Sequence, residues 1–355
     1  MMLDNLLKID PFSIDKKEKS KIFTNQIKSL TFHHYKFCKK YKKIIKNLKF
    51  KIKNINKLEH FPMLPVRLFK KFDFKSVSEN EVVKKIVSSG TSGKKLSKIY
   101  LDKKNAHNQV KVLEKIMSTI LGSKRLPMLI IDQDPELFNK SIFNARAAAI
   151  YGFSIFGKNH CFLLGKKNNI DYVSLNNFLE KYSKDKFLIF GFTSLVYEHL
   201  IKKMSTKTLK SNFKNGVLLH GGGWKKLEKL NINNEQFKQK LFSKIKIKNI
   251  YNYYGLVEQA GSIFIECEKC GHLVTSVFSD IFIRDREFNI VKNGQKGLIQ
   301  LLSLLPTSYP GHNILTEDIG EIIDEEIYKC EIKGKHFLVH GRAKEAEIRG
   351  CSDAG

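Results

Sequence analysis

Hydroxyl side chains, glycines and lysines gather in residues 88–95, directly after a short apolar segment that ends at Val87. The glycines allow the backbone to bend so that successive N–H groups converge on an anion. The hydroxyls add donors and a lysine adds positive charge, which together suit the phosphates of a nucleotide. The candidate phosphate-binding residues are Ser88, Ser89, Gly90, Thr91, Ser92, Gly93 and Lys94.

This loop differs from a Walker A motif at two positions. Ser88 stands where that motif needs its first glycine, and Lys95 stands where a serine or threonine would follow the lysine. The loop therefore indicates a different nucleotide chemistry. The alternative interpretation is a surface turn, which segments rich in Gly, Ser and Thr also form.

Three downstream segments carry further groups that suit a nucleotide. Gly222 and Gly223 follow an apolar segment, where the missing side chains would let a flat base lie against the backbone. Tyr254 and Glu258 follow the next such segment and offer an aromatic face and a carboxylate. We expect Asp318 to lie in a tight turn and to accept two hydrogen bonds from ribose hydroxyls. The alternatives are a solvated acid at position 258 and a turn-capping acid at position 318.

The six cysteines do not form a disulfide framework in a chain of this size. Cys267 and Cys270 have the spacing of a metal-ligand pair, and Cys330 would be a third thiolate for a structural zinc ion. The alternative is a hairpin that carries two half-buried cysteines. We expect Cys38 and Cys161 to be core residues, because their neighbours are apolar.

Cys351 is a candidate nucleophile. Arg342, Lys344 and Arg349 precede it, and positive charge lowers the pKa of a thiol and raises its thiolate fraction. An acyl acceptor needs that property. The alternative is a thiol near the end of the chain that has no role.

The composition limits the class of protein. The chain has 355 residues and a net charge of +28, which would suit a nucleic-acid partner. However, only seven of its 63 basic residues are arginines. Because base recognition relies on arginine, we expect no nucleic-acid partner. The sequence contains no run of about 18 apolar residues, so we expect no membrane span. The N-terminal residues lack the apolar centre of a signal peptide. We expect a cytoplasmic protein.

The apolar pattern predicts an α/β fold with an N-terminal helical segment. Stripes at helical spacing, such as Phe23, Ile27 and Leu30, run through residues 1–60, and two prolines at 62 and 65 then favour extended backbone. Strands and helices alternate from residue 82, with strands expected at 128–131, 187–190, 217–219 and 250–254. One helix face should contain Val110, Leu113, Met117, Ile120 and Leu121. Shorter segments from residue 275 predict an antiparallel β region.

Together these segments resemble, in order and spacing, the core motifs of adenylate-forming enzymes such as acyl-CoA synthetases and luciferases. The resemblance narrows because residues 62–70 read PMLPVRLFK, residues 220–225 read HGGGWK and residues 349–351 read RGC. In these features the chain resembles the acyl-protein synthetase family, typified by the synthetase subunit of the fatty-acid reductase of bacterial luminescence. The match covers essentially the whole chain. Phenylacetate-CoA ligases look like more distant relatives.

The resemblance implies a role for each motif. The loop would bind the ATP phosphates, Gly222, Gly223 and Tyr254 the adenine, and Asp318 the ribose. Glu258 would coordinate Mg²⁺, and Arg342 would lie near the ribose and the acyl phosphate. Cys351 would accept the acyl group of a carboxylic acid, a fatty acid in the typical member, and deliver it to an NADPH-dependent acyl reductase.

The resemblance also sets the expected domain limits and leaves two alternatives open. We expect a helical segment at 1–75, an adenylate-forming α/β domain at 76–340, and a hinge and tail at 341–355. The C-terminal end would be truncated, because full-size adenylate-forming enzymes have a further domain that supplies a lysine. One alternative function is an acyl-CoA or acyl-carrier-protein ligase of the phenylacetate-CoA ligase type. The other is a basic scaffold or nucleic-acid-binding protein without activity.

Overall fold

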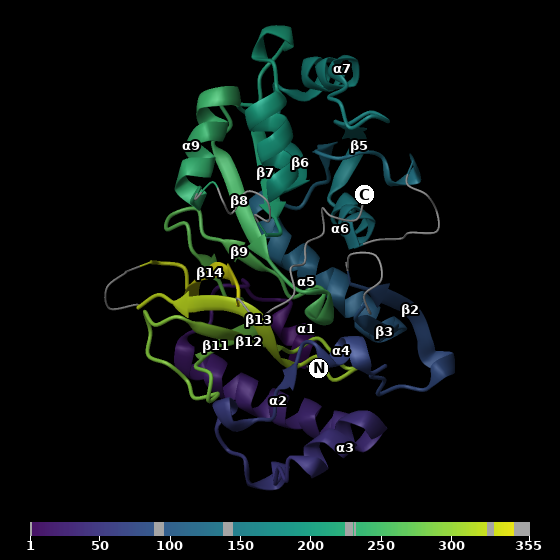
Figure 1. The fold of residues 1–355 in the computed structure, drawn as a ribbon, viewed down its shortest axis with the longest axis vertical. Coiled ribbons are helices and arrows are strands. Elements are labelled where there is room, and N and C mark those ends of the chain that lie inside the picture. Colours follow the sequence, from purple (N-terminus) through teal and green to yellow (C-terminus); the bar gives the residue numbers. More distant parts are fainter. Residues whose placement is uncertain are drawn as a thin grey trace. The chain divides into compact units, whose positions relative to one another are not determined.

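The structure is a computed structural model that describes residues 2–88, 96–137, 145–223, 230, 232–324 and 330–343 (Figure 1). Contacts between residues divide the chain into two compact units. The first unit comprises Met1–Ser88, Lys95–Met117 and Gly255–Glu347, and the second comprises Ser89–Lys94, Ser118–Tyr254 and Ile348–Gly355. The domain limits expected at residues 75 and 340 stay a prediction.

The second unit is built on a parallel sheet. Its strands lie in the order β8-β7-β6-β4-β5, and Figure 1 shows β6, β7 and β8 side by side. The strands are β4 (Leu126–Ile130), β5 (Gly157–Phe162), β6 (Phe187–Phe192), β7 (Gly216–Gly221) and β8 (Asn249–Tyr254). The helices are α6 (Ala145–Ser154), α7 (Tyr172–Tyr182), α8 (Thr193–Val196), a π-helical continuation at Tyr197–Lys203, and α9 (Asn234–Ile245). The alternation of strand and helix, predicted from residue 82, is confirmed from β4 onward, whereas residues 82–87 and 98–102 pair directly as an antiparallel hairpin.

Apolar side chains cover both faces of this sheet. One face packs against α7, the α8 segment and α9, for example through Phe178, Leu200 and Leu241. On the other face, Phe153 of α6 stacks on Phe190 of β6 with ring centroids 4.7 Å apart. Strands that are buried on both faces explain the continuous apolar runs in the sequence.

The first unit begins with helices, as predicted. These are α1 (Met2–Leu6), α2 (Lys16–Phe37) and α3 (Lys39–Asn47), followed by single 3₁₀ turns at Ile52–Asn54 and Leu58–His60. The Asp15 side chain accepts a hydrogen bond from the Glu18 N–H at 2.9 Å, which caps α2. The predicted stripe of Phe23, Ile27 and Leu30 is buried.

The sheet of the first unit has the order β11-β12-β13-β14-β10-β9. All five neighbouring pairs in this order are antiparallel. A short strand, β1 (Leu64–Pro65), adds in parallel to β13. The strands are β9 (Phe264–Glu266), β10 (Leu273–Val274), β11 (Ser279–Arg284), β12 (Gly297–Ser303), β13 (Asn313–Ile322) and β14 (His336–Arg342). The antiparallel region predicted after residue 275 is confirmed.

The remaining elements of the first unit are α4 (Leu68–Lys71), the hairpin of β2 (Val82–Val87) and β3 (Lys98–Asp102), and α5 (Lys103–Leu121), which continues into the second unit. The expected face of α5 is wrong at Val110, which is 42% exposed, whereas Val112 and Ile116 are buried. The buried stripe begins with two polar residues, Asn105 and Gln109. Hydrogen bonds allow their burial, because Asn105 donates to the Leu305 carbonyl and Gln109 donates to Asn105. Apolar periodicity alone does not reveal such a stripe. None of the helices in the described ranges is long and apolar enough to cross a membrane.

Candidate functional site

A pair of serines forms the base of the predicted phosphate-binding loop. Val87 of β2 pairs with Lys98 of β3, and the ladder continues to Ser88 and Ser97. The Ser88 N–H donates to the Ser97 carbonyl at 3.0 Å, and Ser88 Oγ accepts from the Ser97 N–H at 2.9 Å. The Ser88 hydroxyl keeps its own proton to donate. The hairpin therefore fixes Ser88, the first residue of the predicted loop, against Ser97.

Glu258 lies in a single 3₁₀ turn, Val257–Gln259, in the first unit and is buried, with 3% of its surface exposed. Core groups hold its main chain, because the hydroxyl of the fully buried Tyr309 donates to the Glu258 carbonyl at 3.0 Å. The amide of Gln259 donates to the carbonyls of Leu301 and Gly311 at 3.1 and 2.8 Å. The position of this acid is therefore set by the packed interior.

Burial raises the pKa of the Glu258 carboxyl, while the nearby Ser97 hydroxyl and the Arg342 guanidinium lower it and the Asp318 carboxylate raises it. These neighbours show that Glu258 lies beside the base of the loop and near the second predicted acid. No described residue forms an ion pair with the Glu258 carboxylate. A buried carboxylate without a cationic partner is unfavourable unless it takes up a proton or a ligand supplies positive charge.

Asp318 and Arg342 face each other on β13 and β14. Arg342 Nε lies 3.5 Å from Asp318 Oδ1, and Arg342 Nη1 lies 3.6 Å from Glu317 Oε2. Arg67 also binds Glu317, with Nε and Nη2 at 3.0 and 2.9 Å from Oε1. The structure thus brings together two predicted residues, Asp318 and Arg342, and adds Glu317 and Arg67, which were not expected at this site.

The expected tight turn at Asp318 is wrong. Asp318 lies within β13, where the Asp318 N–H donates to Thr316 Oγ1 at 3.1 Å. The register with β14 shifts between Ile319 and Gly320, which marks a β-bulge. A Cβ atom at Gly320 would lie 2.6 Å from the Leu338 carbonyl oxygen. The glycine is thus required by the close approach of a strand, not by a turn.

The predicted glycines of the second unit follow β7, as expected. Thr193, at the junction between β6 and α8, has its Oγ1 3.2 Å from both the Gly221 and the Gly222 carbonyl oxygens and 3.0 Å from His220 Nδ1. Burial lowers the pKa of His220 to about 3, so the ring is neutral at physiological pH. Gly222 has a φ of +83°, which favours glycine. A Cβ atom at Gly223 would meet no atom within 4 Å, so its backbone borders open space.

The tyrosine pair of β8 divides between the two faces of the sheet. Tyr253 is in register with Gly221, and its ring lies so close that a Cβ atom at Gly221 would come within 2.4 Å of Tyr253 Cε1. Tyr254, the residue expected to contact adenine, points to the opposite face because side chains alternate along a strand. Tyr253 packs against Phe153 with ring centroids 4.9 Å apart.

Several predicted site residues lie outside the described ranges. They are Ser89, Gly90, Thr91, Ser92, Gly93 and Lys94 of the loop, and Cys351. Their roles stay predictions. The described part of the chain supplies Ser88, Gly222, Gly223, Tyr254, Glu258, Asp318 and Arg342.

A buried ion pair was missed by the sequence analysis. Asp132 follows β4 and is 1% exposed, and Arg146 of α6 is 7% exposed. Arg146 Nε donates to Asp132 Oδ2 at 2.6 Å, and Arg146 Nη2 bonds the other carboxylate oxygen. Burial raises the pKa of Asp132, and Arg146 opposes that rise. The sequence could have pointed to Asp132, because this residue lies at the carboxyl end of a parallel strand, where α/β proteins collect functional groups.

The three predicted zinc ligands come together in the first unit. The sulfur atoms of Cys267, Cys270 and Cys330 lie within 4.8 Å of one another. His272 and His336 place a ring nitrogen within the same distance of Cys270 and of each other. His336 was not part of the predicted ligand set.

Solved structures with a similar fold are adenylate-forming ligases. A 2-hydroxyisobutyryl-CoA ligase, crystallised in an open conformation with 2-HIB-AMP and CoA, has a TM-score of 0.70 at 13% identity, over 96% of this chain and 78% of that one. The same ligase in its postadenylation state gives 0.69 at 13% identity, over 96% and 71%. ATP-bound MatB from Rhodopseudomonas palustris gives 0.51 at 12% identity, over 77% and 50%. No curated protein sequence matches the chain.

The chain has the α/β fold of adenylate-forming ligases, as the sequence predicted. It belongs to the LuxE acyl-protein synthetase family, whose model matches residues 1–354. It is therefore an ATP-dependent ligase. The family supports formation of an acyl-adenylate followed by transfer of the acyl group to a thiol.

Proposed function

We propose that this protein activates a fatty acid with ATP and Mg²⁺, transfers the acyl group to its own Cys351, and delivers the thioester to an NADPH-dependent acyl reductase. One observation supports this proposal above the others. The buried carboxylate of Glu258, with which no described residue forms an ion pair, lies beside Ser97 at the base of the loop and near Asp318 and Arg342. That arrangement suits a cation and an anionic substrate.

The proposed nucleotide contacts divide by chemistry. The loop contributes hydroxyl and main-chain donors to the phosphates, and Asp318 contributes acceptors to the ribose hydroxyls. Open backbone at Gly223 supports the adenine assignment, because a flat base can approach main chain that carries no side chain. The assigned residues are Ser88, Ser89, Gly90, Thr91, Ser92, Gly93 and Lys94 for phosphate, Gly222, Gly223 and Tyr254 for adenine, and Asp318 for ribose.

Glu258 fits a magnesium ligand. Mg²⁺ prefers carboxylate oxygens and is bound through one or two of them together with substrate phosphates. Such an ion would neutralise the buried charge and draw electron density from the phosphate oxygens. The pKa of Glu258 is raised by burial, so a bound cation would also favour the ionised carboxylate that it needs.

In the first proposed step, a carboxylate oxygen of the acid attacks the α-phosphorus of ATP, and pyrophosphate leaves. Both reactants are anions, so positive groups and correct orientation matter more than a base. Arg342 suits this task, because Glu317 and Asp318 hold its guanidinium in a defined place.

In the second proposed step, the Cys351 thiolate attacks the acyl carbonyl, the bond to the phosphate oxygen breaks, and AMP leaves. The thiol proton goes to solvent. A protein-bound thioester is the product that a reductase could then use, because hydride attack on a thioester carbonyl releases the thiolate. The family description, an acyl-protein synthetase, supports a protein acceptor over free coenzyme A.

Two readouts test the proposal on the full chain. We expect ATP and a straight-chain fatty acid to release pyrophosphate without coenzyme A, and labelled acyl group to stay on the protein in a linkage that hydroxylamine cleaves. Cys351→Ser should still form acyl-adenylate but retain no label, because an alcohol is a far weaker nucleophile near neutral pH. Cys161→Ser is the matched control and should retain the label.

Acyl transfer that requires coenzyme A, or label on Cys38 or Cys161, would refute the internal acceptor and favour the coenzyme A ligase alternative. Absence of pyrophosphate release with every acid in a panel from acetate to palmitate would refute the proposed adenylation. The two results separate the activity from the identity of its acceptor.

A further inference from the structure

Two segments of the first unit bring cysteine and histidine side chains together. Cys267 and Cys270 lie in the turn between β9 and β10, and Cys330 and His336 lie just before and at the start of β14. The segments meet because β10 pairs with β9 on one side and with β14 on the other. An exposed ion pair between Lys269 and Glu331 joins the same two segments.

The turn between β9 and β10 directs both of its sulfur atoms to one side. The Gly271 N–H donates to the Cys267 carbonyl at 2.8 Å, and the Cys267 N–H donates to the His272 carbonyl at 2.8 Å. Gly271 has a φ of +70°, which a residue with a side chain rarely adopts. A Cys-x-x-Cys-Gly turn of this kind presents two ligands for one ion.

Two distances between the ligand atoms match those around a tetrahedral zinc ion, one between Cys267 and Cys330 and one between Cys270 and His336. Zn–S bonds of about 2.3 Å at tetrahedral angles place two sulfur atoms ~3.8 Å apart. Cys267 Sγ and Cys330 Sγ lie 3.7 Å apart, and the Cys270 sulfur lies within 4.8 Å of both. A Zn–S and a Zn–N bond place sulfur and nitrogen ~3.6 Å apart, and Cys270 Sγ and His336 Nδ1 lie 3.3 Å apart.

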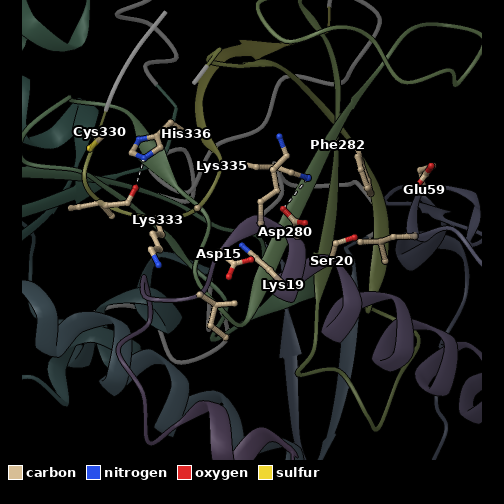
Figure 2. Close-up of a pocket in the computed structure, with 15 residues that line it drawn as sticks. Asp15, Lys19, Ser20, Glu59, Asp280, Phe282, Cys330, Lys333, Lys335 and His336 are labelled. Atoms are coloured by element: carbon tan, nitrogen blue, oxygen red, sulfur yellow. Dashed lines mark hydrogen bonds and ion pairs between the residues drawn. The ribbon is translucent and has the colours of Figure 1, made fainter. Parts of the chain in front are cut away.

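His336 is oriented as metal-binding histidines usually are. Its Nε2 lies 2.9 Å from the Ile332 carbonyl oxygen, to which only a protonated nitrogen can donate. That bond leaves the lone pair on Nδ1, the atom that faces Cys270. Figure 2 shows His336 next to Cys330 on the wall of a pocket of about 550 Å³, with the bond from its ring drawn as a dashed line.

We propose that Cys267, Cys270, Cys330 and His336 bind one structural Zn²⁺ ion. Three thiols lose their protons to solvent when the ion binds, and the thiolates and the neutral imidazole complete its four ligands. Thiolates select a soft or borderline ion, which excludes Mg²⁺ and Ca²⁺ from this cluster. Four protein ligands leave no open position, so the ion stabilises the fold and does not take part in the chemistry of the ligase.

The position of the cluster indicates what the ion stabilises. His336 is the first residue of β14 and Arg342 is its last. The ion would fix the start of the strand to the β9–β10 turn, whereas pairing with β13 holds β14 from Phe337 to Arg342. Loss of the ion should therefore loosen the segment from Cys330 to His336 before it affects the centre of the sheet.

Metal analysis of the full chain, purified without chelators, tests the proposal. We expect about one equivalent of zinc per chain. Cys330→Ser and His336→Ala should lose most of it, while Cys161→Ser and His272→Ala keep it. A strong chelator should lower the melting temperature of the wild type, and added Zn²⁺ should restore it, with neither effect in Cys330→Ser.

Cobalt replacement keeps the proposal testable if a variant fails to fold. Wild-type protein loaded with Co²⁺ should show the visible bands of a tetrahedral ion and the near-ultraviolet band of thiolate ligands. Zinc-free wild-type protein, a Cys267–Cys330 disulfide found by mass spectrometry, or octahedral cobalt bands would each overturn the site. Loss of zinc in His272→Ala but not in His336→Ala would overturn the choice of the fourth ligand.

Discussion

The two glycines that flank Gly222 should respond in opposite ways to the same added methyl group. In Gly221→Ala the new Cβ would lie 2.4 Å from Tyr253 Cε1 and 2.7 Å from Tyr253 Cδ1, far inside the carbon–carbon contact distance of about 3.5–4.0 Å. The ring cannot move freely, because it packs against Phe153. Overpacking of this kind costs about 1–3 kcal/mol, so we expect Gly221→Ala to lower the free energy of unfolding by that amount.

In Gly223→Ala the new Cβ would meet no atom within 4 Å, so stability should stay within about 0.5 kcal/mol of the wild type. If adenine lies against this backbone, the methyl group fills the space of the base. We expect the KM for ATP to rise roughly tenfold or more, which corresponds to ~1.4 kcal/mol, with no loss of stability. Urea denaturation and pyrophosphate release measure the two effects separately.

The pair of variants can refute the reasoning in two ways. A wild-type KM for ATP in Gly223→Ala would show that adenine does not approach this backbone. Wild-type stability in Gly221→Ala would show that the Tyr253 ring is not held in place by its neighbours. Equal loss of stability in both variants would contradict the open space seen at Gly223.

Two further predictions concern buried charges. Glu258→Gln should lower kcat/KM for pyrophosphate release by roughly 10²–10³-fold, yet stabilise the unliganded protein at neutral pH. Burial raises the pKa of Glu258 in the folded state, so ionisation opposes folding above the unfolded pKa, and the difference in stability should vanish in acid; equal stability at every pH would contradict this. Arg146→Met leaves Asp132 buried and unpaired and should cost about 3–5 kcal/mol at pH 7 by denaturant titration. The loss should shrink in acid as Asp132 is protonated, and Asp132→Asn in the same chain should restore part of it; wild-type stability of Arg146→Met would show that the pair contributes nothing.

Local signals in the sequence predicted most elements that carry the site. Short apolar runs predicted β2 before the loop, and β7 and β8 before their glycines, because each run depends only on residues close in sequence. The stripe of Phe23, Ile27 and Leu30 predicted the buried face of α2 for the same reason.

Contacts between distant residues were not predictable in this way. The Asp-Ile-Gly sequence at 318–320 favours a turn on local propensity, and pairing of β13 with β14 overrides that propensity. Arg146 reaches Asp132 from the following helix, and His336 reaches Cys270 across 66 positions. A single sequence contains no signal for such pairs, because their geometry depends on how elements pack.

The segment before α4 shows how one unexpected contact follows from a register. β1 pairs in parallel with β13, with Leu64 beside Ile314 and Pro65 beside Leu315. The same offset of 250 positions places Arg67 beside Glu317, where the two side chains form a hydrogen bond and an ion pair.

Arg67 is 57% exposed and Glu317 only 10%, so an ion pair at this surface contributes little to stability. Its effect is instead on Arg342, which lies 3.6 Å from Glu317 and 3.5 Å from Asp318. Without Arg67, the buried Glu317 would draw Arg342 toward itself, because an unpaired buried carboxylate seeks the nearest cation. We therefore expect Arg67 to help keep Arg342 between Glu317 and Asp318.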